Sequence, residues 1–372
     1  MKKIICYLCF ASVLLSFLCF KVSAENEYGF DTLRQEVTES LSDAMSSEVK
    51  EALRYMGIDS LDFEKVYNLS FSDVLSYFTP MIKEKAKGVG SGFCEMLVAV
   101  LLLCIITTVT ENSSMNKALL LLGDAVMILL SFSHVSSILN SCVSVMKISG
   151  GFIFSFVPVL TLIISFSGNP ASALAYNGFV MGITQVMSAF VNNGLTESLG
   201  AFFCLAVTFS LNESFNTGKL ISVVNKAFSL LMGILGSLFS GILTIKNIMA
   251  VSVDSLSVRG VRFLLSSFIP VIGSSISEAY SSVLGSINLI KGSVVVIGIL
   301  AVAIINLPVI AESLLWYFSF SVLSYISESA SIGQISDLFR AVCCLIRILL
   351  ILVVFEMFLL IISTGIMLTF RQ

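Results

Sequence analysis

The sequence has 372 residues, of which 56% are hydrophobic and 12% charged, with a mean hydropathy of +0.98. A soluble domain carries about twice that charged fraction, so there are too few polar residues to cover a water-soluble surface. The net charge of -3 shows no excess of basic over acidic residues, which excludes a typical nucleic-acid-binding protein. Continuous runs of Leu, Ile, Val and Phe predict an all-α, polytopic integral membrane protein with roughly six to nine crossings.

Residues 1–24 have the pattern of a signal peptide. Lys2 and Lys3 precede an apolar stretch at 4–20, and small residues place the cleavage site after Ala24. An uncleaved first helix is the alternative. Cleavage would leave the following region outside the cytoplasm.

Residues 25–92 form the part of the chain whose composition suits contact with water. Fourteen acidic and seven basic residues lie between positions 25 and 95, and apolar residues recur at helical spacing through Val37 and Leu41. We expect a break near 57–59, a helix that Pro80 ends, and a flexible glycine-rich hinge before the membrane. The region is therefore predicted to be a small extracytoplasmic domain of amphipathic helices.

Residues 93–372 are predicted to form a multi-pass transmembrane domain with re-entrant or broken helices. Pro158 interrupts one apolar run, and residues 263–290 alternate apolar pieces with Ser and Gly. The runs that qualify as spans lie at about 94–110, 118–140, 151–167, 173–191, 198–212, 220–245, 292–311 and 341–370.

The distribution of positive charge conflicts with a simple alternation of crossings. An exported N-terminal region followed by six full crossings would place residues 246–262 outside, yet this loop carries three basic residues against one acidic residue. Loops rich in Lys and Arg favour the cytoplasm. We therefore expect one candidate span between 141 and 245 to be a re-entrant or interfacial half-helix.

No pattern in the sequence indicates an enzyme. His134 is the single histidine of the sequence and lies on an apolar run, where packing is expected rather than catalysis. Ser144 and Lys147 have the spacing of a Ser/Lys nucleophile pair, so an intramembrane hydrolase is a hypothesis that rests on these two residues. The nine cysteines show no metal-ligand spacing, and no cofactor or metal is expected.

Ionisable residues within the apolar runs are the strongest functional candidates, because an unpaired charge in lipid costs several kcal/mol. They predict a polar path through the bundle, and the alternatives are structural ion pairs or side chains that reach the membrane interface. Interface positions are favoured for Lys226 and Glu278. The candidates for the polar path are Asp124, Glu312, Arg347 and Glu356.

Small residues recur on one run in a spacing that permits close helix packing. Such residues allow two helix backbones to approach each other in lipid, although the partner helix is left open. The candidate packing residues are Gly233, Gly236, Ser237, Ser240 and Gly241.

The stretch between 254 and 298 is the most distinctive in the sequence. Its most specific element is a Phe-Ile-Pro-Val-Ile-Gly segment, followed by an acidic-Ala pair and a glycine before a Val/Ile/Gly run. The residues concerned are Phe268, Ile269, Pro270, Gly273, Glu278 and Gly285. With these residues the chain resembles the stage III sporulation protein AE family of endospore-forming bacteria. Ser and Gly fill positions near 274–286, where the family pattern has more Lys, Asp and Ala, so a divergent member is expected.

The resemblance covers nearly the whole chain and implies a function. It implies a membrane-embedded subunit of the mother cell–forespore channel or secretion-like complex required for endospore development. The implied partners are other stage III sporulation proteins and stage II sporulation protein Q, and the implied location is the mother-cell membrane around the forespore. The family has no assigned catalytic residues. The alternative is a stand-alone secondary transporter or permease, which an inverted repeat would support, and no clear self-similarity relates the two halves.

Overall fold

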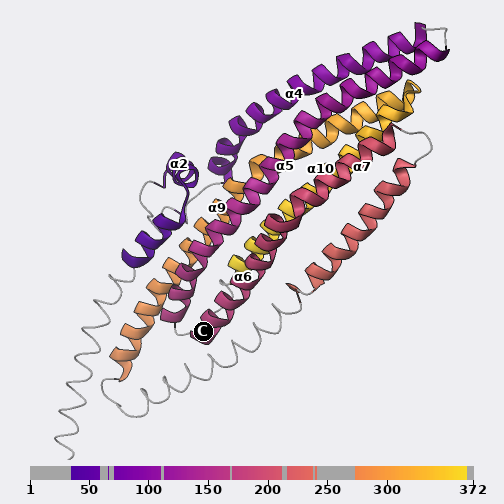
Figure 1. Cartoon of the computed structure of the whole chain (residues 1–372). Helices are drawn as coiled ribbons and strands as arrows, with labels where there is room; N and C mark the ends of the chain where they lie inside the picture. The colour runs from indigo at the N-terminus through magenta and orange to yellow at the C-terminus, as the bar shows by residue number, and fades with distance from the viewer. Residues whose placement is uncertain are drawn as a thin grey trace, which may run out of the picture.

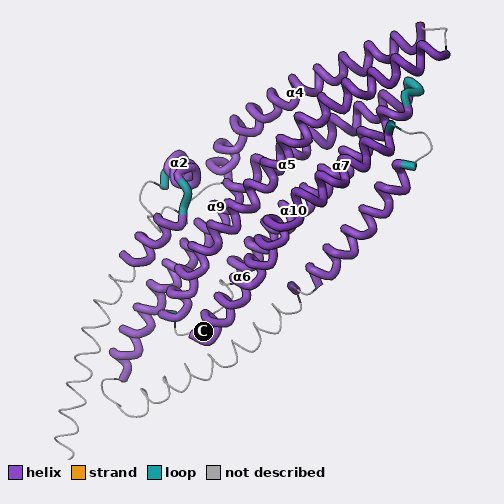
Figure 2. The backbone as a smooth tube through the Cα atoms, in the orientation of Figure 1, coloured by secondary structure: helices purple, strands orange, loops and turns teal. Residues whose placement is uncertain are grey.

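The computed structural model describes residues 35–58, 66, 71–109, 113–167, 170–211, 216–237, 239–240 and 273–366. Within these residues the chain is almost entirely helical and has no strand, which confirms the all-α prediction. Figures 1 and 2 show an elongated bundle in which the long helices lie side by side. The predicted signal peptide and its cleavage site at Ala24 lie outside the described residues.

Two short amphipathic helices precede the bundle, a helix at 35–44 and α2 (Ser47–Tyr55). Ser46 caps α2, since its Oγ accepts a hydrogen bond of 3.4 Å from the backbone N–H of Val49. The helix ends before Gly57, whose φ of +84° is a left-handed conformation that glycine adopts without strain. The break predicted near 57–59 is therefore confirmed at its first residues.

The helix α4 (Phe71–Val109) runs without interruption for 39 residues. The predicted helix end at Pro80 and the predicted hinge at 88–92 were both wrong, because both positions lie inside α4. Pro80 has no backbone N–H, so one carbonyl oxygen in the preceding turn lacks its helical hydrogen bond. Because Pro80 is exposed, this carbonyl can turn away from the bundle. The glycines lower helix propensity by about 1 kcal/mol each, and packing of α4 against the bundle offsets this.

The helix α5 (Ser113–Phe166) is also continuous, with 54 residues. It contains the two runs predicted as separate spans at 118–140 and 151–167, and the predicted interruption at Pro158 was wrong. The proline lies on an exposed face, whereas its neighbours Phe156 and Leu160 are fully buried. Tertiary packing of the buried face therefore keeps the helix together where local propensity predicts a break.

A second continuous helical run leads back along α5. It consists of α6 (Pro170–Phe190), the π turn η1 (Val191–Leu195) and α7 (Thr196–Ser210), and it contains the runs predicted at 173–191 and 198–212. A π turn inserts one extra residue and changes which side chains face the bundle after it. A further helix at Thr217–Ser237 follows along the outside of the bundle (Figure 1), and its Asn225 accepts a hydrogen bond from Arg347 of α10.

The last two helices form an antiparallel hairpin, α9 (Gly273–Ser329) and α10 (Gly333–Ile366). The alternation of apolar pieces with Ser and Gly at 263–290 predicted a broken helix, which was wrong from Gly273 onward because α9 is continuous there. Residues 263–272 lie outside the described part. Ser and Gly have low helix propensity, but they are compatible with a helix that neighbouring helices stabilise by packing. The run predicted at 292–311 is a portion of α9, and the run predicted at 341–370 coincides with α10 up to Ile366, beyond which the residues are not described.

Five described helices are long and apolar enough to cross a membrane, which confirms the multi-pass prediction. At a rise of 1.5 Å per residue, α5 and α9 are each about 80 Å long, more than twice the ~30 Å hydrocarbon thickness of a bilayer. Tilt at ordinary angles does not absorb this difference. Each long helix therefore extends well beyond a single hydrocarbon layer, and the re-entrant half-helix between 141 and 245 stays a prediction.

The buried side chains form two hydrophobic clusters along the bundle. The first joins the N-terminal helices and α6 to 152–164 of α5 and to 287–304 of α9. The second joins α4, α7 and α10 to 127–146 of α5 and to 316–323 of α9. On α4, α5 and α9 a short stretch that contains Lys85, Ser149 and Glu312 separates the two clusters, whereas on α10 the second cluster continues to Leu359.

Candidate functional site

The four residues predicted to form a polar path lie on three different helices. Asp124 is on α5, Glu312 on α9, and Arg347 and Glu356 are on α10. Within the described part of the chain, no hydrogen bond or ion pair joins any two of them. The structure therefore does not bring them together in one polar path, and each has its own surroundings.

Glu312 forms an ion pair between α9 and α4. Its Oε2 accepts a hydrogen bond of 2.6 Å from the Nζ of Lys85, and the side chains are 15% and 41% exposed. One helical turn away, the rings of His134 and Trp316 pack against each other with centroids 4.3 Å apart and planes tilted by 33°. The alternative of a structural ion pair between helices fits Glu312, because its charge already has a partner on another helix.

His134 packs at a close junction of α4, α5 and α9. A Cβ built at Gly92 of α4 would lie 2.7 Å from Cη2 of Trp316 and 2.8 Å from Cε1 of His134. These distances leave no room for a side chain at this position. The packing role expected for the histidine agrees with its partly buried position against the ring of Trp316.

Arg347 connects α10 to the helix at Thr217–Ser237. It donates a hydrogen bond of 2.9 Å to Oδ1 of Asn225, and the Sγ of Cys344 lies 3.3 Å from the same oxygen. Arg347 is otherwise exposed. Its guanidinium therefore both holds the neighbouring helix and presents positive charge at the surface.

Asp124 and Glu356 are buried carboxyl groups without partners among the described residues. Their residues are 3% and 5% exposed, and neither Oδ2 of Asp124 nor Oε2 of Glu356 has a hydrogen-bond partner. An unpaired carboxylate in an apolar interior is expensive, so these two groups have to be protonated or solvated in the assembled protein. They are the two candidates that fit the functional interpretation.

Buried polar contacts between α5 and α9 were missed by the sequence analysis. The Nδ2 of Asn306 donates a hydrogen bond of 2.9 Å to the Oγ of Ser149, and both residues are fully buried. The Sγ of Cys142 lies 3.6 Å from the Oγ of Ser313. The amide at 306 interrupts an apolar run of the sequence, which could have identified it, whereas its partner on α5 could not be found without the fold.

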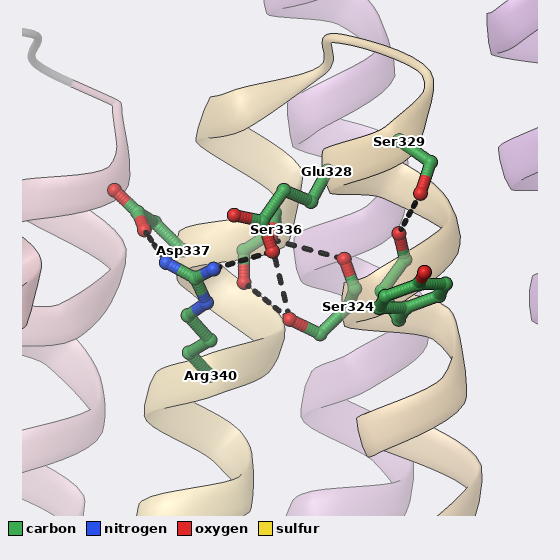
Figure 3. A network of polar contacts seen from close by, with 7 residues as sticks. Ser324, Glu328, Ser329, Ser336, Asp337 and Arg340 are labelled. Atoms are coloured by element: carbon green, nitrogen blue, oxygen red, sulfur yellow. Dashed lines mark hydrogen bonds and ion pairs between the residues drawn. The ribbon is translucent and has the colours of Figure 1, made fainter.

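A network of polar contacts closes the end of the α9–α10 hairpin (Figure 3). The hydroxyls of Ser324 and Ser336 lie 3.2 Å apart, and each donates to the other residue's carbonyl oxygen, at 3.2 Å and 3.0 Å. Arg340 forms ion pairs with Glu328 and Asp337 nearby. These contacts fix the hairpin end, and no catalytic arrangement is present among them.

The described residues contain no arrangement that supports catalysis or metal binding. Ser144 and Lys147 are both exposed and make no hydrogen bond to each other, so the nucleophile hypothesis gains no geometric support. No group of His, Cys, Asp or Glu residues in the described part of the chain is placed to hold a metal ion.

The predicted packing residues lie on an open face of the helix at Thr217–Ser237. Gly233 and Ser237 are exposed, a Cβ at Gly233 would meet no atom within 4 Å, and no residue in the most apolar window of this helix is buried. Gly236 faces α10, where a Cβ would lie 3.9 Å from the ring of Phe355. Ser240 is exposed, and Gly241 lies outside the described residues.

The residues that carry the family resemblance are only partly described. Phe268, Ile269 and Pro270 lie outside the described residues, and α9 begins at Gly273. The backbone at Glu278 and Gly285 is part of the same helix. The resemblance is therefore tested by comparison with known proteins rather than by geometry.

Those comparisons agree with the resemblance. The family model for stage III sporulation protein AE matches residues 49–370. Stage III sporulation protein AE of Bacillus subtilis (strain 168) is 21% identical over 213 residues, which make up 56% of this chain and 53% of that protein. The alignment thus spans about half the length of the curated relative. No solved structure matches the chain significantly.

Proposed function

Because this chain belongs to the stage III sporulation protein AE family, we propose that it is a membrane-embedded subunit of the channel or secretion-like complex between mother cell and forespore. Family membership assigns it a role in sporulation, and the family is one of sporulation proteins rather than of known enzymes. In the proposed function the protein acts by assembly with other subunits and has no catalytic step.

The observation that carries this proposal is the open helix at Thr217–Ser237. None of its spanning window is buried within the chain, although it presents Gly233 and Ser237 on its surface. Small residues allow close contact between helix backbones in lipid, where helix association depends on packing rather than on the hydrophobic effect. A helix of this kind suits contact with another subunit.

The distribution of ionisable groups supports a subunit over a self-contained transporter. Asp124 and Glu356 are buried and unpaired, but they lie apart on different helices, and Glu312 is paired with Lys85. A substrate site at the membrane midplane needs several polar groups that converge. A polar conduit would therefore have to form between subunits.

The proposed partners are other stage III sporulation proteins and stage II sporulation protein Q. The proposed location is the mother-cell membrane around the forespore, with the acidic N-terminal helices outside the mother-cell cytoplasm. Exposed carboxylates on the 35–44 helix and α2, among them Glu39, Asp43 and Glu51, suit an aqueous space between membranes.

Deletion of the gene tests the proposal. We expect spore development to stop after engulfment, and we expect a tagged, functional copy to co-purify with the other stage III proteins. Microscopy with a membrane dye measures the stage of arrest, and mass spectrometry of the purified material identifies the partners. Normal spores combined with loss of uptake of a solute would contradict the proposal and support the stand-alone transporter.

A further inference from the structure

Positively charged side chains from four helices lie at one level of the bundle and are exposed. On α4 and α5 this level lies between the two hydrophobic clusters, while α10 contributes buried residues to the second cluster on both sides of Arg347. We call this group the cationic belt. Its members are Lys83, Lys87, Lys147, Lys226 and Arg347.

The ion pair between α4 and α9 fixes the position of the first two members. Lys85 lies 2.6 Å from Glu312, so these two residues share a level. Lys83 and Lys87 are two residues away on either side, which is a displacement of about 3 Å along the helix. Both therefore lie at the level of Glu312.

Two contacts between α5 and α9 fix the position of Lys147. Ser149 contacts Asn306, and Cys142 contacts Ser313, so the two helices run antiparallel here. The lysine lies between these two contacts in the sequence of α5. Its level on α9 is therefore between Asn306 and Ser313, within about 6 Å of Glu312.

Contacts of α10 place the remaining two members. The Sγ of Cys343 lies 3.8 Å from the carbonyl oxygen of Tyr317, and Arg347 follows one helical turn further along the antiparallel hairpin. Arg347 contacts Asn225, and Lys226 is the next residue on that helix. The whole belt thus occupies about 10 Å of the bundle's length.

The belt has an excess of positive charge. The carboxylates at this level are Glu84, which is exposed, and Glu312, which is already paired with Lys85. Among the described residues, no carboxylate lies within 4.0 Å of a nitrogen of Lys83, Lys147 or Lys226, and the same holds for Lys87. The ammonium groups are therefore available to an external anion.

The belt borders stretches that have the length of a bilayer's hydrocarbon layer. No charged residue occurs in 148–166 of α5, in 170–190 of α6 or in 292–311 of α9. A stretch of about 20 residues spans about 30 Å, the hydrocarbon thickness. On the other side of the belt, 96–109 of α4 is also free of charge. The belt therefore lies at the edge of the charge-free stretches of α5 and α9.

We propose that the cationic belt binds the phosphate groups of anionic phospholipids at the edge of the bilayer. Lysine ammonium groups on flexible stems are suited to phosphate as point charges, and the negative surface potential of a membrane attracts basic residues next to an apolar segment. Binding at this level would set the depth of the bundle in the membrane. The proposal does not depend on the channel function.

The test uses the full chain, purified in detergent and titrated with phosphatidylglycerol or with phosphatidylcholine. Native mass spectrometry counts the lipids retained, and the titration gives apparent affinities. We expect phosphatidylglycerol to bind more tightly, and we expect each Lys→Gln change in the belt to weaken it by about fivefold, as expected for one charge near an anionic surface. The quadruple variant K83Q/K87Q/K147Q/K226Q should lose the preference for phosphatidylglycerol.

Two controls separate the belt from net charge and from misfolding. K50Q removes one exposed cation on α2, outside the belt, and should leave the affinity unchanged. The four Lys→Arg changes keep the charge and should retain the preference for phosphatidylglycerol. Equal binding of both lipids by the unmodified chain, or equal losses in K50Q and K147Q, would overturn the proposal. Displacement of phosphatidylglycerol by millimolar inorganic phosphate would overturn the assignment to lipid.

Discussion

Three glycines determine how closely the long helices approach one another. A Cβ at Gly92 would clash with His134 and Trp316, one at Gly123 with Leu103, and one at Gly298 with the ring of Phe156. Each glycine lies at a contact between two long helices, and each is buried. The absence of a side chain thus permits the close approach of α4, α5 and α9.

Replacement of Gly298 by alanine should destabilise the bundle. The new methyl group would overlap the ring of Phe156, which is 1% exposed and stacked on Phe152, so the ring has little room to move. Overpacking of this kind costs about 1–3 kcal/mol. Thermal unfolding in detergent should show a lower midpoint, and the second change Phe156→Leu should restore part of it.

Gly182→Ala is the matched control for that substitution. Gly182 is an exposed helical glycine of α6, and a Cβ there would meet no atom within 4 Å. Alanine at an open helical position is expected to stabilise by about 0.5–1 kcal/mol. Equal destabilisation by both substitutions would contradict the close approach at Gly298.

Charge exchange should measure the contribution of the ion pair between α4 and α9. Glu312→Lys alone would place two ammonium groups together, and Lys85→Glu alone would place two carboxylates together. Each single change should lower stability by about 1 kcal/mol, because Lys85 is partly exposed. The double exchange Lys85→Glu/Glu312→Lys should recover most of the unfolding midpoint. Additive losses in the double variant would show that the two residues do not interact.

At the scale of elements, the helix at Thr217–Ser237 differs from its neighbours. Half of the spanning window of α9 and of α10 is buried, whereas none of the spanning window of this helix is. It is joined to the bundle by contacts of Asn225 with Arg347 and Cys344 and by the approach of Gly236 to Phe355. Apolar side chains of this helix also pack, partly buried, against the second hydrophobic cluster; they are Leu220, Ile221, Val224, Phe228 and Met232. Its exposed residues, among them Gly233 and Ser237, are available to another helix.

Gly233→Ile should impair assembly while leaving the isolated chain stable. The position is exposed and has open space around it, so the effect on unfolding should remain within about 0.5 kcal/mol. In sporulating cells, the tagged variant should co-purify with less of its partner proteins. The control Gly178→Ile makes the same change at another exposed helical glycine, on α6. Equal co-purification by the two variants would contradict a role of Gly233 in assembly.

At the scale of the whole molecule, the direction of α4 places α2 and the α9–α10 turn toward opposite ends of the bundle. Tyr55 of α2 contacts Tyr77 near the start of α4, with ring centroids 5.7 Å apart. From there α4 runs parallel to α9, as the contacts at Lys85 and Gly92 show. The apolar half of α4 therefore lies between α2 and the α9–α10 turn.

Cysteine labelling should place these two ends on opposite sides of the membrane. With an exported N-terminal region, Ser47→Cys on α2 should react with an impermeant maleimide in intact protoplasts of vegetative cells that express the chain, where the exported side faces the medium. Ser329→Cys, at the end of α9, should react only after permeabilisation. The parent chain, which retains its native cysteines, provides the background. Reaction of both positions in intact protoplasts would contradict a single crossing by α4.

The sequence by itself determined the class of fold and the family. A backbone in lipid must satisfy its own hydrogen bonds, which leaves helices or a closed β-barrel, and the apolar runs are continuous rather than alternating, which selects helices. The helical spacing at Val37 and Leu41 and the break at Gly57 follow from local rules, and the structure confirms them. The segment that begins at Phe268 carried enough specific residues to indicate the family, which the match over 49–370 confirms.

The tertiary structure alone decided where the helices continue and which polar groups meet. Local propensity predicts breaks at Pro80 and Pro158, but packing over two large hydrophobic clusters outweighs those penalties and leaves continuous helices. Contacts between Lys85 and Glu312, more than two hundred positions apart, have no local pattern. The same holds for the cationic belt, because its common level exists only when four helices are placed side by side.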